Sequence, residues 1–235
     1  MSKKIADAFK NGKAFIGFLT AGDPDLDTTK KIIKKVAQAG CDLVEIGIPF
    51  SDPIAEGPVI QKANIRALKN NVTTDDVFQM IDEIKNDVDI PMVFMTYLNV
   101  LFKYGYDRFL TRAKEVGICG VIIPDLPYEE KGELQSVAKN YGIEVVSLIA
   151  PTSEERIKMI AADAEGFVYA VSSLGVTGVR NEIKTDLESI TAAVKEVTDI
   201  PVAIGFGIST PEQAKKYAAV SDGVIVGCLL YTSDA

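Results

Sequence analysis

The sequence predicts an α/β fold in which about eight short buried strands alternate with amphipathic helices and close into one barrel. Three observations support this prediction. Short apolar runs recur along the 235 residues, segments with helical spacing separate them, and no stretch rich in proline or serine divides the chain. Regular recurrence favours a closed (β/α)8 barrel, the TIM barrel, over a doubly wound sheet. We therefore expect a single domain over residues 1–235.

Eight apolar runs are the predicted strands, because continuous hydrophobicity is typical of parallel strands that are buried on both faces. They cover residues 14–19, 43–48, 92–96, 120–124, 144–149, 166–170, 201–205 and 223–227. Residues 27–39 are typical of the intervening helices, with apolar residues on one face and lysines largely off it. Helices should end at Gly40, Gly117 and Gly142, since glycine adopts the left-handed conformation that closes a last turn. A further helix is expected at about residues 2–11.

Composition excludes several classes of function. The net charge of −8 leaves no basic surface for nucleic acid. There is no histidine, and Cys41, Cys119 and Cys228 lack the spacing of a metal site, so we expect no metal and interpret the cysteines as core thiols of a protein in a reducing compartment. The N-terminus lacks the apolar segment of a signal peptide, and no apolar run could span a membrane. The expected location is the cytoplasm.

Acidic residues mark the end of the second predicted strand. Glu45 interrupts an otherwise apolar run, and a buried carboxylate is costly to keep without a partner or a purpose. Asp52 and Glu56 follow in a loop that three prolines stiffen. An alternative is an outward-facing Glu45 paired with a lysine, an Asx turn at Asp52 and a solvated Glu56. Several acids beside one strand end nevertheless indicate acid/base catalysis.

The loops after the sixth, seventh and eighth strands suggest a lid and an anion site. Extra chain after a strand lies at the catalytic face of such a barrel. Residues 172–184 contain glycines and hydroxyls that suit a mobile lid, although an ordinary solvent loop is the alternative. Gly207 and Gly227 follow strands seven and eight, where such barrels hold phosphate on backbone N–H groups.

Taken together, these segments resemble the tryptophan synthase alpha family along nearly the whole chain. The resemblance rests on EIGIPFSDPIAEGP at residues 45–58, PDLP at 124–127, SSLGVTG at 172–178 and GFGIS at 205–209, with FLTAGDP at 18–24 and YLN at 97–99 in the same order. It implies a (β/α)8-barrel lyase that cleaves indole-3-glycerol phosphate to indole and glyceraldehyde 3-phosphate by a retro-aldol reaction in tryptophan biosynthesis.

The resemblance also implies roles for individual residues. Glu45 matches the main general acid/base, and Glu56 matches the family's second acid, which is usually aspartate. Thr177 matches a lid threonine that meets this acid on closure. The remaining implied contacts with the substrate are Tyr169 beside it, Phe18, Met95, Tyr97, Ile122, Ile149 and Phe206 around the indole, and Gly178, Gly207 and Gly227 at the phosphate.

A partner is implied as well. A beta subunit should join this chain in an α2β2 heterotetramer and receive the indole, and pyridoxal phosphate is expected only in that subunit, with no cofactor in this chain. The family usually has a serine and further helices after Gly227. Residues 228–235 differ from this pattern, so the last helix and part of the phosphate site are expected to be missing.

Two other functions remain open at this point. One is another phosphate-binding barrel enzyme of aromatic amino-acid or sugar-phosphate metabolism, which would lack the PFSDP loop. The other is a non-catalytic, allosteric activator of the beta subunit.

Overall fold

A closed barrel of parallel strands is the centre of the molecule. The computed structural model describes residues 3–171 and 186–227, and within them each strand pairs with its neighbours in sequence, β8 closing against β1. The strands are β1 Ala14–Thr20, β2 Leu43–Gly47, β3 Met92–Met95, β4 Gly120–Ile122, β5 Glu144–Ile149, β6 Val168–Val171, β7 Val202–Gly205 and β8 Gly223–Val226. The predicted (β/α)8 barrel is confirmed.

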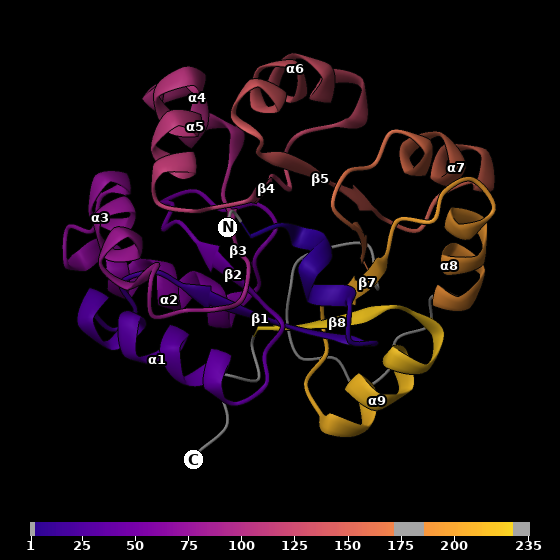
Figure 1. Cartoon of the computed structure of the whole chain (residues 1–235), viewed down its shortest axis with the longest axis horizontal. Coiled ribbons are helices and arrows are strands. Elements are labelled where there is room, and N and C mark those ends of the chain that lie inside the picture. The colour runs from indigo at the N-terminus through magenta and orange to yellow at the C-terminus, as the bar shows by residue number, and fades with distance from the viewer. Residues whose placement is uncertain (1–2, 172–185, 228–235) are drawn as a thin grey trace.

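Helices form a ring around the strands (Figure 1). They are α1 Leu26–Gln38, α2 Pro58–Lys69, α3 Thr74–Ile84, α4 Leu98–Tyr104, α5 Tyr106–Glu115, α6 Lys131–Tyr141, α7 Glu154–Ala162, α8 Leu187–Lys195 and α9 Pro211–Val220, with a short 3-10 helix η2 at Tyr128–Glu130. Gly40, Gly117 and Gly142 have φ values of 99°, 83° and 70°, as their predicted role at helix ends requires. No helix in the described part of the chain is long and apolar enough to cross a membrane.

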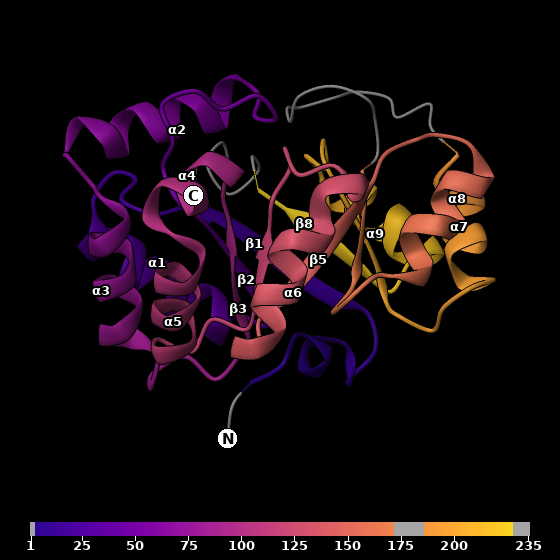
Figure 2. The same ribbon diagram turned by 90° about the horizontal axis from the view of Figure 1, so that it is seen from above.

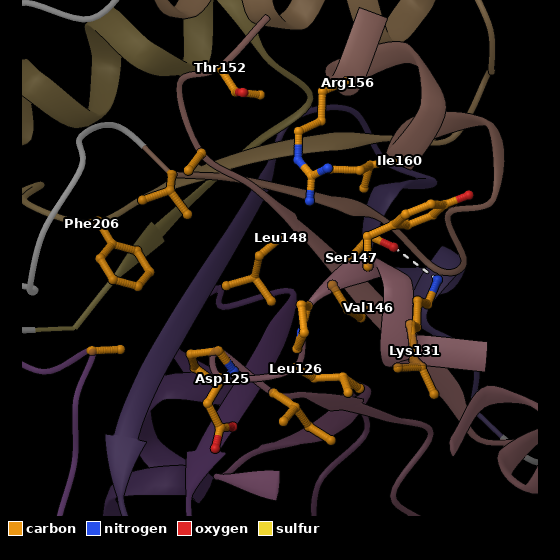
Figure 3. Close-up of a pocket in the computed structure, with 18 of the residues that line it drawn as sticks. Asp125, Leu126, Lys131, Val146, Ser147, Leu148, Thr152, Arg156, Ile160 and Phe206 are labelled. Atoms are coloured by element: carbon orange, nitrogen blue, oxygen red, sulfur yellow. Dashed lines mark hydrogen bonds between the residues drawn. The ribbon is translucent and has the colours of Figure 1, made fainter. Parts of the chain in front are cut away.

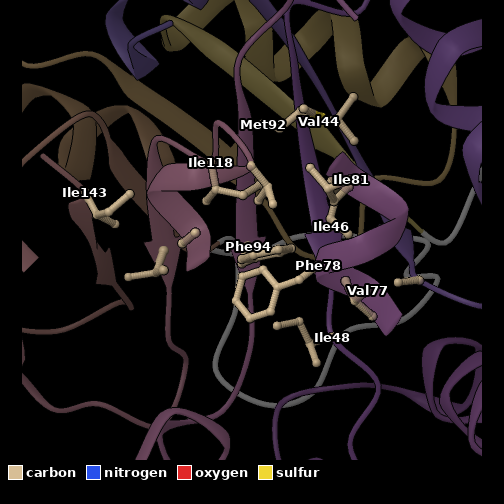
Figure 4. Packing of buried hydrophobic residues seen from close by; sticks show 14 of the residues in the cluster. Val44, Ile46, Ile48, Val77, Phe78, Ile81, Met92, Phe94, Ile118 and Ile143 are labelled. Carbon is tan, nitrogen blue, oxygen red and sulfur yellow. The ribbon is translucent and has the colours of Figure 1, made fainter. Parts of the chain in front are cut away.

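Alternation along each strand sends side chains to two separate apolar regions. On β2, Val44 and Ile46 pack outward against α3, where Phe78 meets Phe94 of β3 edge to face at 5.4 Å (Figure 4). Leu43 points the other way, into a cluster that fills the barrel interior. By the same alternation Glu45 faces the interior, which excludes its outward-facing alternative.

The N-terminal segment closes one end of the barrel. The helix predicted at about residues 2–11 is a shorter 3-10 helix, η1 Ile5–Phe9. Figure 2 shows η1 at one end of the barrel and α2 at the other. Ile5 is fully buried, and a Cβ added to Gly120 or Gly166 would lie 2.6 or 2.8 Å from its Cδ1 atom. The glycines therefore leave the space that Ile5 fills, and the opposite end stays available for a site.

Replacement of Ile5 by alanine is expected to lower the free energy of unfolding by about 2–5 kcal/mol, because a cavity would remain between the two glycines. The measurement is urea unfolding monitored by circular dichroism. Ile65→Ala is the matched control, since Ile65 lies on α2 and is 53% exposed, and it should change stability by less than about 1 kcal/mol. Equal losses in the two variants would contradict the role of Ile5.

Candidate active site

A pocket opens at the carboxyl ends of the strands, on the side of the barrel opposite η1. The residues around it come from the ends of strands and from the loop after β2, and they are Phe18, Ala55, Glu56, Ile60, Met95, Pro124, Tyr169, Phe206, Gly207, Ile208, Ile225 and Gly227. Glu56 is the one charged residue among them. An apolar pocket with a single carboxylate suits an aromatic ligand that has one hydrogen-bond donor.

Glu45 is buried in the barrel interior next to this pocket. It pairs in register with Phe18 of β1, which lines the pocket, and with Val93 of β3. Its side chain is fully buried, and neither carboxylate oxygen has a hydrogen-bond partner among the described residues. Burial disfavours the charged form and raises the pKa of Glu45 from 4.5 to about 8. The group is therefore a protonated acid at neutral pH, as a general acid requires.

Glu56 has a different environment. It is 7% exposed and accepts a hydrogen bond from the hydroxyl of Tyr97. Burial raises the pKa of Glu56, and the Tyr97 hydrogen bond opposes this rise. The same hydroxyl accepts a hydrogen bond from the N–H of Ala55 at 2.9 Å, and the Tyr97 ring stacks on Phe50 at 5.0 Å. Tyr97 thus fixes both the carboxylate and the loop that carries it.

An ion pair holds the helix that follows this loop. Arg66 of α2 donates two hydrogen bonds of 2.7 Å to the carboxylate of Asp23, which lies after β1 and is 5% exposed. Two parallel hydrogen bonds define the orientation of both groups. The start of α2 directly follows Glu56 and Gly57, so the Asp23–Arg66 ion pair holds the C-terminal end of the acidic loop.

The end of β7 forms the opposite wall. Phe206 has φ 70°, a left-handed conformation that is uncommon outside glycine. Its ring meets Tyr169 edge to face at 5.6 Å. A Cβ on Gly205 would lie 2.4 Å from the Tyr169 hydroxyl, so only glycine lets Tyr169 cross the strand here. Local backbone strain therefore positions an aromatic wall.

Gly207 and Gly227, the predicted phosphate-binding glycines, lie beside this wall and line the pocket. No lysine or arginine is among the described residues that line it. An anion at this end would therefore be bound by backbone N–H groups, to which residues without a side chain allow close approach.

Some of the residues predicted to contact the substrate line the pocket, and others lie elsewhere. Phe18, Met95, Tyr169 and Phe206 line the pocket. Tyr97 is not among the lining residues but hydrogen-bonds to Ala55 and Glu56, which line the pocket. Ile122 belongs to the barrel interior and does not line the pocket. Thr177 and Gly178 of the predicted lid, and residues 228–235, lie outside the described residues.

One predicted wall residue is wrong. Ile149 packs outside the barrel against α7 and α8, because its position on β5 alternates with that of Leu148. Leu148 is the residue that faces inward, against the interior cluster. The alternation of side chains along a strand could have indicated this. Val146 and Leu148 are two positions apart and so face the same side of β5, and Val146 belongs to the interior cluster.

Other predicted features have simpler outcomes. Asp52 is exposed, whereas Glu56 is buried rather than solvated. Cys41 and Cys119 are buried thiols, and Cys228 lies outside the described residues. Within residues 3–171 and 186–227, no group of three or more Cys, Asp or Glu side chains is arranged to hold a metal ion.

These features define a class of protein. A (β/α)8 barrel with a protonated, buried glutamate, a second glutamate in an apolar pocket and glycines at the carboxyl ends of β7 and β8 has the features of a barrel enzyme whose active site lies at that end.

Comparison with known proteins identifies the family. The profile of the tryptophan synthase alpha chain matches residues 5–233. The alpha chain from Lacticaseibacillus casei is 51% identical over 227 residues, which are 97% of this chain and 85% of the relative. Among solved structures, Mycobacterium tuberculosis tryptophan synthase has a TM-score of 0.90 at 33% identity and covers 100% of this chain and 92% of that chain. The alpha subunit from Campylobacter jejuni has a TM-score of 0.86 at 32% identity, with 97% and 92% covered.

The chain belongs to the tryptophan synthase alpha chain family. It is a carbon–carbon lyase of tryptophan biosynthesis that cleaves indole-3-glycerol phosphate.

Burial of Glu45 predicts an unusual dependence of stability on pH. Its pKa is about 8 when folded against 4.5 ordinarily, so the folded state holds one more proton between these values and stability falls by about 1.4 kcal/mol per pH unit as the pH rises. Glu45→Gln removes this slope. We expect the variant to match the wild type near pH 5 and to be more stable near pH 8, by on the order of 3–4 kcal/mol.

Urea unfolding of both proteins at several pH values measures the effect. The control is Glu133→Gln, which changes an exposed glutamate on α6 and should leave the wild-type pH dependence intact. Parallel pH curves for Glu45→Gln and the wild type would show that Glu45 is charged in the folded protein.

Tyr97→Phe tests whether the Tyr97 hydroxyl lowers the pKa of Glu56. Loss of the hydrogen bond should raise the pKa of Glu56 further and move the acidic limb of the kcat/KM profile upward by about one pH unit. The loss of activity should therefore be larger at pH 6 than at pH 9. Tyr104→Phe is the control, because Tyr104 donates to the exposed Asp75 away from the site. A loss of activity that is equal at every pH would indicate a packing role instead.

Proposed function

We propose that Glu45 is the general acid and base of the cleavage. The observation that carries this proposal is its burial without a partner directly beside the pocket, which keeps its proton at neutral pH. Proton transfer to a carbon atom needs an acid whose proton is not already held in a hydrogen bond with another group. Among the described interior residues of the barrel, Glu45 meets that requirement.

The reaction needs a proton to be controlled at three positions. Glu45 donates its proton to C3 of the indole ring, which weakens the bond between C3 and the glycerol side chain. The resulting carboxylate then accepts the proton of the adjacent hydroxyl as that bond breaks, the hydroxyl oxygen becoming the aldehyde of glyceraldehyde 3-phosphate and the bond electrons returning to the indole ring. Glu45 ends protonated as it began, so one residue serves both proton steps.

Glu56 accepts a hydrogen bond from the indole N–H at the third position. Positive character develops on this nitrogen when C3 is protonated, and a nearby carboxylate stabilises it. The family usually has aspartate here. Glutamate is one methylene longer, and its hydrogen bond with Tyr97 supports the proposal that the carboxylate is held back on the pocket wall to compensate for this length.

The remaining substrate contacts are proposed from the pocket lining and the resemblance together. Phe18, Tyr169 and Phe206 bind the indole and Gly207 and Gly227 bind the phosphate, supported by their positions around the pocket. Thr177 and Gly178 complete the site by resemblance alone.

The partner is proposed to be a beta subunit in an α2β2 heterotetramer, which binds pyridoxal phosphate while this chain binds no cofactor. The similar M. tuberculosis structures are of tryptophan synthase as a whole. We place the complex in the cytoplasm.

Glu45→Gln is expected to reduce indole release from indole-3-glycerol phosphate by at least about 1000-fold, because neither proton step would retain its catalyst. Indole is measured by chromatography, with and without added beta subunit. Glu56→Gln should lose less, about 10- to 100-fold, since a neutral hydrogen-bond acceptor would remain.

Glu144→Gln is the matched control. Glu144 is also a strand glutamate whose pKa burial raises, but it begins β5 at the end of the barrel that η1 closes, so its variant should remain active. Activity of Glu45→Gln equal to that of the wild type would refute the assignment, and an inactive wild type that still stimulates the beta subunit would favour the non-catalytic alternative.

A further inference from the structure

The loop between β2 and α2 borders the whole substrate site. This acidic loop, residues 48–57, contributes Ala55 and Glu56 to the pocket. Ala55 also lines a cavity of about 660 Å³ over the ends of β4 and β5 (Figure 3), which shares Pro124 and Phe206 with the pocket and forms one site with it. The position of the acidic loop therefore decides where Glu56 meets a bound substrate.

Helix α2 holds both ends of the acidic loop. Gln61 of α2 donates from its side-chain amide to the carbonyl oxygen of Glu56 at 2.8 Å. Asn64, one turn further along and buried, accepts from the N–H of Phe50 at 3.3 Å. Because side chains of one helix bond to the backbone near the start and at the end of the loop, a displacement of α2 moves Glu56 with it.

The ion pair between Asp23 and Arg66 fixes the other half of α2. Its two hydrogen bonds of 2.7 Å join the Asp23 carboxylate to Nε and to one terminal nitrogen of Arg66. The side chain of Asp23 is 3% exposed. A bidentate pair with one buried partner defines the orientation of the guanidinium group, whereas a lysine would supply the charge without this geometry.

Two further contacts hold the turn after β1 against the end of α2. The Asn70 amide donates to the carbonyl oxygen of Pro24 at 2.6 Å. A Cβ on Gly22 would lie 2.7 Å from a methyl group of Val72, so the backbone of the turn lies directly against the residues that follow the helix. Asp23 is therefore the middle residue of a closely packed turn.

We propose that Asp23 and Arg66 are positioning residues for Glu56, which act through α2 although neither of them lines the pocket. This inference rests on the proposed contact between Glu56 and the indole N–H. The contacts run from the turn after β1 to Arg66, along α2, and from α2 to the acidic loop. Misplacement of a group at a reacting centre by about 1 Å can cost on the order of 100-fold in rate, even when the mutation lies far away.

The test is a double-mutant cycle on kcat/KM for the cleavage of indole-3-glycerol phosphate by the full chain. Arg66→Gln should lower kcat/KM by about 10-fold or more in the wild-type background. In a Glu56→Ala background no carboxylate remains to be positioned, so the same change should cost less than about twofold. Losses of equal size in the two backgrounds would overturn the proposal, because Arg66 would then act on another part of the protein.

Arg66→Lys and Asp23→Asn are gentler variants that separate orientation from charge. Lysine keeps the positive charge but lacks the paired donors, and asparagine keeps the shape of aspartate with one acceptor oxygen instead of two. Each should lower kcat/KM by about 3- to 10-fold in the wild-type background and by less than about twofold in the Glu56→Ala background. Wild-type activity in both variants would overturn the proposal.

Lys69→Gln is the matched control. It removes one positive charge from α2 at a position one turn after Arg66, and Lys69 is exposed and takes no part in the ion pair with Asp23. The variant should keep kcat/KM within about twofold of its parent in both backgrounds. A loss as large as that of Arg66→Gln would show that the charge of α2 matters and the Asp23 pair does not.

The Glu56→Ala variant alone separates the two levels of inference. Activity equal to that of the wild type would refute the proposed role of Glu56 and, with it, the positioning role. If Glu56→Ala is impaired but Arg66→Gln costs the same with and without Glu56, only the positioning role fails. Circular dichroism confirms that each variant is folded at the assay temperature.

Discussion

The burial of one uncharged glutamate is the constraint around which this barrel is organised. The interior of a small (β/α)8 barrel is filled by side chains, and here Glu45 occupies an interior position with no hydrogen-bond partner among the described residues. Such a group is tolerated because it remains protonated. The stability lost by placing it there is inseparable from the raised pKa of its carboxyl group, since burial causes both.

The second acid, Glu56, has a contrasting environment in which hydrogen bonds fix the carboxylate and its loop. Tyr97 hydrogen-bonds both Glu56 and the backbone of its loop, and the Asp23–Arg66 pair holds the helix that follows. Pairs of titratable groups with contrasting environments are what separate acid from acceptor roles. Two glutamates only 11 positions apart in the sequence thus have distinct chemistry because one points into the sealed interior and the other rests on the pocket wall.

The sequence was sufficient for the order of strands and for the two acids, because hydrophobic runs, glycine stops and a carboxylate within an apolar strand are local signals. It was insufficient where two segments must be placed against each other. Ile149 was assigned to the pocket although the parity of β5 directs Leu148 inward. The resemblance implies that Tyr97 contacts the substrate, and its hydrogen bond to Glu56 has no local signal in the sequence because it spans 41 positions.

The depth of the pocket follows from pairing large side chains with glycines on adjacent strands. Phe18 lies over Gly47 and Tyr169 over Gly205, at distances that a Cβ would not permit, and Phe18 also packs tightly over Gly227. Each glycine leaves the space that an aromatic ring of the wall occupies. Phe206 differs, because a left-handed backbone conformation rather than a neighbouring glycine sets its direction. Walls that pack against strand backbone resist rearrangement, so the shape of this pocket is set by the strands of the barrel themselves.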